Sequence, residues 1–81
     1  MDRERLELRG EFVTLGQLLK IWNVAETGGA ARFVLEDSDV RVNGERETRR
    51  GRKLFAGDVV SLPKQLVDGG LEIEIVGAGQ G

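Results

Sequence analysis

The sequence contains no cysteine, no histidine and no tyrosine. Without cysteine the chain forms no disulfide and offers no thiolate as a zinc ligand or as a nucleophile. Without histidine it also lacks the usual general base near neutral pH and a common transition-metal ligand. The carboxylates form no paired motif, and no phosphate-loop signature is present. We therefore expect a protein that holds no metal or cofactor and is not an enzyme.

Long apolar runs are missing as well. No stretch approaches the roughly 18 apolar residues that a membrane span requires. The charged start Met1-Asp2-Arg3-Glu4-Arg5 is not followed by the apolar segment of a secretory signal. We expect a cytoplasmic protein that does not contact a membrane.

The length of 81 residues suits one compact domain and not two. Apolar residues make up 40% of the chain and charged residues 32%, which is typical of a globular protein rather than a disordered one. We expect a single, monomeric domain over residues 1–76. Residues 77–81, which are mostly glycine, have nothing to bury and are expected to form a flexible tail.

Two helices are predicted near the N-terminal end of the domain. Thr14 followed by Gln17 forms a capping box, and an apolar stripe at helical spacing follows it. Thr27 is a second N-cap candidate, and the helix after it has a broad apolar arc. The stripe is Leu15, Leu18, Leu19 and Trp22, and the arc is Ala30, Ala31, Phe33, Val34 and Leu35. We place Trp22 and the phenylalanines in the core, which disfavours a platform for stacking RNA bases.

Alternating apolar and polar residues predict strands on both sides of the helices. The strand segments are residues 6–9, 40–42, 59–62 and 71–76. Asn43-Gly44 predicts a hairpin turn, because both residues tolerate the positive φ of a type I′ turn. The order predicts an α+β fold, with a two-helix hairpin packed on a small antiparallel or mixed β-sheet.

Positive charge is concentrated in one part of the chain. Residues 41–53 carry six cations and two carboxylates, a net charge of +4, so the other residues must carry −6 to give the overall −2. The six cations are Arg41, Arg46, Arg49, Arg50, Arg52 and Lys53. A local positive field of this kind favours a polyanionic ligand even on an acidic molecule.

Four segments carry a resemblance to a known family. They are Thr27-Gly28-Gly29-Ala30-Ala31-Arg32, Val40-Arg41-Val42-Asn43-Gly44-Glu45, Arg49-Arg50-Gly51-Arg52-Lys53-Leu54 and Gly57-Asp58-Val59-Val60. In order and spacing they resemble the alpha-L RNA-binding motif, typified by the RNA-binding domain of small-subunit ribosomal protein S-four. The similarity runs from about residue 12 to residue 62 and is strongest to standalone bacterial members of the YbcJ and YaaA type. It implies RNA lying across the second helix and the adjoining strand loops.

The chain departs from the family pattern at both helix starts. Many relatives open the first helix with Arg-Leu-Asp, where this chain has Thr14-Leu15-Gly16. Many also have Ser-Arg at the start of the second helix, where Thr27-Gly28 stands here. RNA contacts made by those arginines in relatives therefore do not transfer to this chain.

The predicted RNA-binding surface combines a helix start with cations. The first N–H groups of the second helix form an anion site, and glycine allows a phosphate close to them. Arginine can grip phosphate with two hydrogen bonds and stack on unpaired bases. The predicted residues are Lys20, Gly28, Gly29, Arg32, Arg41, Arg49, Arg50, Arg52 and Lys53. The alternatives are that the glycines only shape the turn between the helices and that the cations are only solvated.

The predicted function is recognition of structured RNA, ribosomal or transfer RNA, mainly through phosphate contacts. A protein–protein adaptor whose basic loop binds an acidic partner would use the same arginines. DNA binding is less favoured, because neither helix offers side chains arranged to read a major groove.

Overall fold

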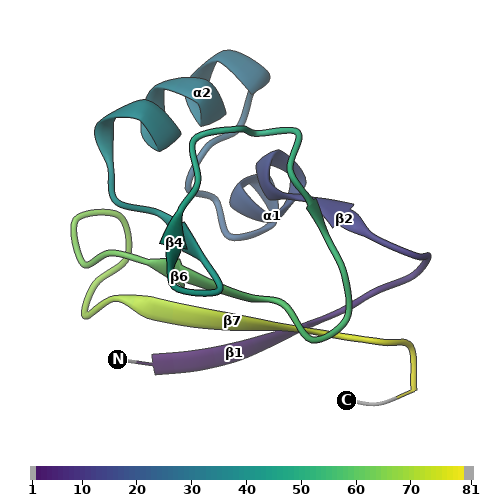
Figure 1. The fold of residues 1–81 in the computed structure, drawn as a ribbon. Coiled ribbons are helices and arrows are strands. Elements are labelled where there is room, and N and C mark those ends of the chain that lie inside the picture. The colour runs from purple at the N-terminus through teal and green to yellow at the C-terminus, as the bar shows by residue number, and fades with distance from the viewer. Residues whose placement is uncertain (1, 80–81) are drawn as a thin grey trace.

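The computed structural model describes residues 2–79 and shows two helices packed on a sheet (Figure 1). The helices are α1 (Leu15–Ile21) and α2 (Gly28–Asp37). The strands are β1 (Asp2–Glu7), β2 (Val13–Thr14), β3 (Arg41–Val42), β4 (Glu45–Arg46), β5 (Lys53–Leu54), β6 (Val59–Leu62) and β7 (Leu71–Val76). The predicted α+β class is confirmed. Of the expected tail, residues 80 and 81 lie outside the described residues.

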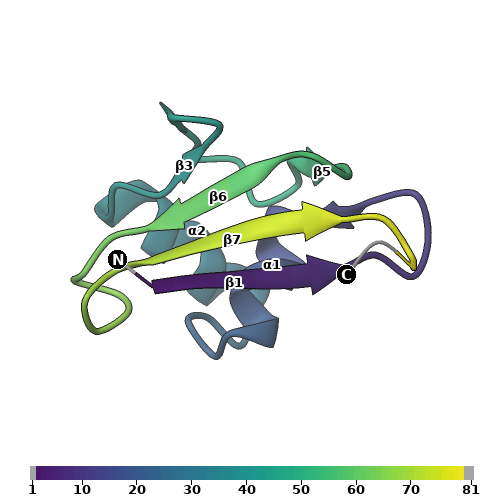
Figure 2. The same cartoon turned by 90° about the horizontal axis from the view of Figure 1, so that it is seen from below.

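The main sheet is mixed and has the strand order β1-β7-β6-β3-β4. β1 runs parallel to β7, and the other neighbours in this sheet are antiparallel. β2 and β5 form a separate antiparallel ribbon. Both helices lie on one face of the main sheet, and the opposite face is open (Figure 2). None of the helices in residues 2–79 is long and apolar enough to cross a membrane.

The first strand differs from the prediction at both ends. Residues 6–9 were expected to form it, but β1 spans Asp2–Glu7. Most of its side chains are exposed, so apolar alternation does not mark it. Its partner is β7, and the ion pairs Arg3–Glu72 and Arg5–Glu74 accompany the pairing at 3.5 and 3.6 Å. Backbone bonds to a strand almost seventy residues away therefore set its length.

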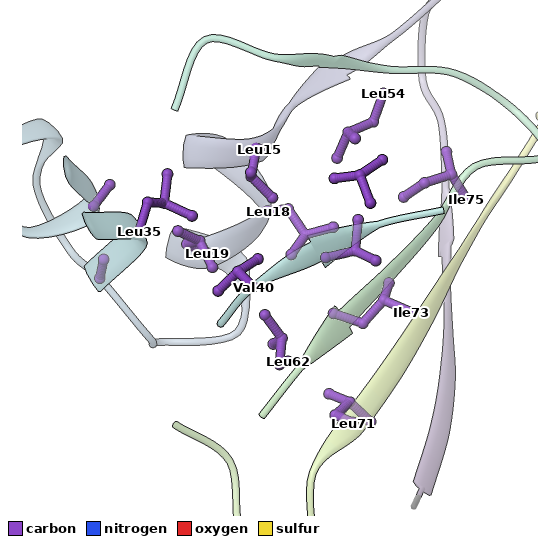
Figure 3. Packing of buried hydrophobic residues seen from close by; sticks show 14 of the residues in the cluster. Leu15, Leu18, Leu19, Leu35, Val40, Leu54, Leu62, Leu71, Ile73 and Ile75 are labelled. Carbon is purple, nitrogen blue, oxygen red and sulfur yellow. The ribbon is translucent and has the colours of Figure 1, made fainter. Parts of the chain in front are cut away.

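The core lies between the helices and the covered face of the sheet (Figure 3). The predicted stripe of α1 supplies Leu15, Leu18 and Leu19, all fully buried. Ile73 and Ile75 of β7 face them from the sheet and are also fully buried. Each such side chain contributes about 1.5–3 kcal/mol to stability through burial. The helices are therefore fixed firmly against the sheet.

Both predicted helix starts are confirmed. Thr14 Oγ1 accepts a hydrogen bond from the Gln17 amide at 3.2 Å, and Gln17 Oε1 accepts one from the Thr14 amide at 2.8 Å. Thr27 Oγ1 accepts from the Ala30 amide at 3.1 Å. These bonds satisfy amides that the first turn of a helix leaves without backbone partners.

The predicted hairpin turn between β3 and β4 is also confirmed. Asn43 and Gly44 have φ values of 53° and 83°, as a type I′ turn requires. The Asn43 side chain does more than permit this turn. It accepts a hydrogen bond from the Val59 amide at 2.9 Å and donates one to Asp58 at 3.0 Å. These bonds tie the hairpin to the start of β6.

The placement of the phenylalanines in the core was wrong. Phe33 is 67% exposed, Phe55 48% and Phe12 42%, whereas Trp22 is partly buried against the core. On α2, Ala31 and Leu35 face the core, and Phe33 is two residues from each, about 200° around the helix. Ala30 is exposed for a similar reason. The predicted apolar arc of α2 was too wide, because the helix contacts the core on one side only, through Ala31 and Leu35.

Candidate nucleic-acid interface

We call the basic segment between β4 and β5, residues 47–52, the arginine loop. It rises from the sheet to the level of the helices and returns beside β2 (Figure 1). The Leu15 amide donates to the Arg52 carbonyl at 2.9 Å, and the Gly16 amide donates to the Arg50 carbonyl at 2.8 Å. The loop therefore caps the first turn of α1 through its backbone. A Cβ on residue 16 would lie 3.2 Å from the Arg50 oxygen, so glycine there permits this close approach.

Glu47 holds the loop from beneath. Its side chain is almost completely buried, with 6% of the residue exposed. Its carboxylate accepts hydrogen bonds from the amides of Thr48 and Arg49 at 3.0 and 3.1 Å. It also accepts from Arg49 Nη2 at 3.0 Å and from Arg52 Nη1 at 2.9 Å. One carboxylate thus neutralises part of the charge of two arginines and fixes the path of the loop between them.

The same contacts change the acidity of Glu47. The side-chain hydrogen bond from Arg49 is the main reason why its pKa falls from 4.5 to about 2, and the Arg49 amide and Arg52 add to this effect. Burial of the carboxylate acts in the opposite direction. The bond to Glu47 in turn raises the pKa of Arg49. From the sequence, Glu47 was counted only as one of two carboxylates in the basic segment, and its structural role was not predicted.

The low pKa of Glu47 predicts acid sensitivity. A carboxylate whose pKa is lower in the folded state stabilises the fold above its unfolded pKa, and this stabilisation is lost as the pH falls from about 4.5 to about 2. We expect a loss on the order of 2 kcal/mol, because both arginines are partly exposed and water screens the interaction. Denaturant unfolding of the wild type and of Glu47→Gln across this range measures it. Equal pH dependence in both proteins would contradict the assignment.

A groove of about 310 Å³ lies between α1, the start of α2 and the arginine loop. We call it the helix–loop groove. Lys20, Gly28 and Arg50 line it together, so the structure joins residues from three separate sequence segments. A Cβ on residue 28 would be only 2.9 Å from Arg50 Nη1. The guanidinium of Arg50 therefore lies directly against the start of α2.

The groove has the features of an anion site. Within the described residues, the amides of Gly28 and Gly29 donate no hydrogen bond, because the first turn of a helix has no preceding carbonyls to accept them and the Thr27 side chain accepts from Ala30. In the same part of the chain, neither Lys20 nor Arg50 forms an ion pair. Glu26 also lines the groove and partly offsets their charge. Two unpaired cations and the positive end of a ten-residue helix still leave the groove attractive to an anion.

The remaining predicted residues lie around this groove or away from it. Arg49 and Arg52 bind Glu47, and Lys53 lies over the Phe12 ring, 4.8 Å from its centroid. Outside the lining of the groove, Arg32 pairs with Glu36 at 3.2 Å, and Arg41 pairs with Asp39 at 3.1 Å. The structure therefore brings together Lys20, Gly28 and Arg50, with Gly29 beside them, and leaves Arg32 and Arg41 apart.

The two glycines at the start of α2 do not make the turn between the helices. Both are helical, and the chain reverses at Asn23, whose φ is 58°. They also differ from each other. A Cβ on Gly28 would contact Arg50, whereas a Cβ on Gly29 would meet nothing within 4 Å. Gly28 thus has a specific role in leaving room for the Arg50 side chain.

This difference predicts that two alanine variants have similar stability but different affinity for an anion. Alanine favours helix over glycine, so Gly28→Ala and Gly29→Ala should each leave stability unchanged or raise it by up to about 1 kcal/mol. Only Gly28→Ala should displace the Arg50 guanidinium, and we expect its affinity for an anionic ligand to fall about 3- to 10-fold, the loss of one displaced contact. Titration with transfer RNA alongside thermal unfolding tests this. Equal affinities of the two variants would rule out the proposed contact.

Comparison with known proteins agrees with this geometry. The S4 domain family matches residues 6–68. The chain belongs to the S4 domain family. The matched residues of this S4 domain include both helices, the arginine loop and the whole helix–loop groove. The resemblance described from the sequence is confirmed.

Two bacterial relatives show how much of the chain is shared. The Bacillus subtilis (strain 168) protein named "Probable ribosome maturation protein RlbA" is 50% identical over 52 residues, which cover 64% of this S4 domain protein and 73% of that relative. The Escherichia coli (strain K12) protein named "Putative RNA-binding protein YbcJ" is 38% identical over 50 residues, covering 62% of this chain and 71% of the relative.

Proposed function

We propose that this protein binds structured RNA, ribosomal or transfer RNA, mainly through phosphate contacts in the helix–loop groove. The observation that carries the proposal is the position of Arg50 against the start of α2. Arg50, Lys20 and Gly28 line one groove, and within the described residues the Gly28 amide, like that of its neighbour Gly29, donates no hydrogen bond. Charged side chains and helix N-terminal amides are the groups that commonly hold phosphates.

The names of the relatives support the proposal that the anion bound in the groove is RNA. One is named for ribosome maturation and another for RNA binding, and both share more than a third of their aligned residues with this chain. Because Glu47 offsets part of the charge of Arg49 and Arg52, we assign these two arginines to supporting the loop. Arg32, Arg41 and Lys53 are proposed as outer contacts to the RNA backbone. We further propose that the protein acts as a cytoplasmic monomer without enzymatic activity.

Salt dependence of binding tests this proposal. If the groove and its surroundings neutralise two to four phosphates, the affinity for transfer RNA should fall about 10- to 100-fold between 50 and 200 mM salt. Duplex DNA of similar length should compete more weakly at the same ionic strength. Affinity that does not change with salt would exclude phosphate contacts as the main source of binding.

The alternative of a protein adaptor is separated by a different measurement. The protein is used to capture partners from a lysate with and without ribonuclease. RNA binding predicts that the captured proteins are lost after nuclease treatment, because they are retained through RNA. A protein partner that survives the nuclease and needs Arg50 would favour the adaptor.

A further inference from the structure

Two exposed phenylalanines face each other at the edge of the arginine loop. Val13 of β2 pairs with Leu54 of β5, so the next pair in this register brings Phe12 opposite Phe55. Their ring centroids are 6.0 Å apart, and the ring planes are tilted by 52°. Leu54 points into the core, so its neighbours Lys53 and Phe55 are on the outer face of the ribbon. Nearly half of each ring residue is exposed to solvent.

These rings adjoin the helix–loop groove. Thr14, which pairs with Lys53 across the ribbon, lines the groove. Phe12 lines a second, mainly apolar hollow of about 470 Å³, and Gln17 and Lys20 line both this hollow and the groove. A ligand held by Lys20 in the groove can therefore extend past Gln17 and Lys20 into the hollow that Phe12 lines.

A cation accompanies the rings. Lys53 Nζ lies 4.8 Å from the centroid of Phe12, where the ammonium is attracted to the face of the ring. No acidic side chain in the described part of the chain forms an ion pair with Lys53. The ammonium can therefore turn to a phosphate without breaking an ion pair. The site thus offers an aromatic surface and, 4.8 Å from one ring, a cation that forms no ion pair within the described residues.

We propose that Phe12 and Phe55 form a stacking site for an unpaired RNA base, with Lys53 holding the adjoining phosphate. The inference rests on the RNA binding proposed above and adds the class of RNA. Bases within a duplex are already stacked on one another, so only a base in a loop or bulge can reach the rings. The ligand is then a structured RNA with an unpaired base next to the strand that crosses the groove. A stacking platform was disfavoured from the sequence, in part because the phenylalanines were placed in the core, and their exposure removes that reason.

The test compares two RNA duplexes that differ by one bulged 2-aminopurine. The wild type should bind the bulged duplex about 5-fold or more tightly than the uninterrupted one, and the 2-aminopurine fluorescence should change on binding as the base leaves the RNA stack for the rings. The double variant F12L/F55L keeps apolar bulk but removes the aromatic faces, so the preference and the fluorescence change should disappear. Its salt dependence should stay unchanged, because the phosphate contacts remain. The matched control is Phe33→Leu, which removes an exposed phenylalanine from α2 and should retain the preference.

The possible outcomes separate this inference from the proposed function. If the wild type binds both duplexes equally, or if F12L/F55L keeps the preference, the stacking site is wrong while RNA binding stands. If the wild type binds neither RNA, both proposals are wrong. A second variant, F12Y/F55Y, keeps the aromatic faces and should retain the preference even if the leucine variant is unstable. Loss of the preference in the folded tyrosine variant, or a nuclease-resistant protein partner that requires the two rings, would also overturn the proposal.

Discussion

Replacing Lys20 and Arg50 together by glutamate should lower the affinity for transfer RNA more than about 100-fold, with the fold unchanged. Hydrogen bonds to charged groups contribute about 1.5–3 kcal/mol each, and two such contacts would be replaced by repulsion. A loss of about 3 kcal/mol already corresponds to more than a hundredfold change in affinity. Both side chains are exposed and, within the described residues, have no acidic partner to lose. Filter binding and circular dichroism measure the two expectations.

The choice of these two residues follows from the structure. Removing all four cations of residues 49–53 would also remove both arginines that hold Glu47, and weaker binding could then reflect a displaced loop. Arg9→Glu with Lys64→Glu is the matched control, because it makes the same change of charge away from the helix–loop groove. Both side chains are exposed and, within the described residues, neither forms an ion pair that the change would break. If the control loses as much affinity as the groove variant, the binding reflects total charge and not the groove.

Local signals predicted the parts of the fold that short segments determine. The caps at Thr14 and Thr27 and the Asn43-Gly44 turn depend on hydrogen bonds and φ values within a few residues, so the sequence displays them directly. β7 was equally clear, because its alternate side chains are buried on one face. These elements were predicted correctly because the interactions that form them lie within a few residues or repeat along one strand.

Long-range pairing explains what the sequence did not show. β2 and β5 contain two residues each and pair across about forty residues of chain, so neither has a detectable period. The exposure of Phe12 and Phe55 follows from that ribbon and was missed with it. The Arg50 contact with Gly28 has the same origin. It places the Arg50 guanidinium at the start of the second helix, although Arg50 is more than twenty residues further along the chain. Glycine at positions 16 and 28 allows the close approach of Arg50, but the sequence does not reveal which residue approaches them.

Glu47→Gln should also change RNA affinity strongly. Whether the affinity rises or falls shows if RNA binding depends on the net charge of the arginine loop or on its conformation. Glu47→Gln makes the surface more positive, so a simple field argument predicts tighter RNA binding. We expect affinity to fall about 10-fold, because Arg49 and Arg52 lose their shared carboxylate, repel each other and release the loop that positions Arg50. Glu45→Gln is the matched control, since it removes an exposed carboxylate two residues away and should raise affinity slightly. Titration of both variants with transfer RNA at one salt concentration decides the question. Tighter binding by Glu47→Gln would show that the charge of this loop matters and its conformation does not.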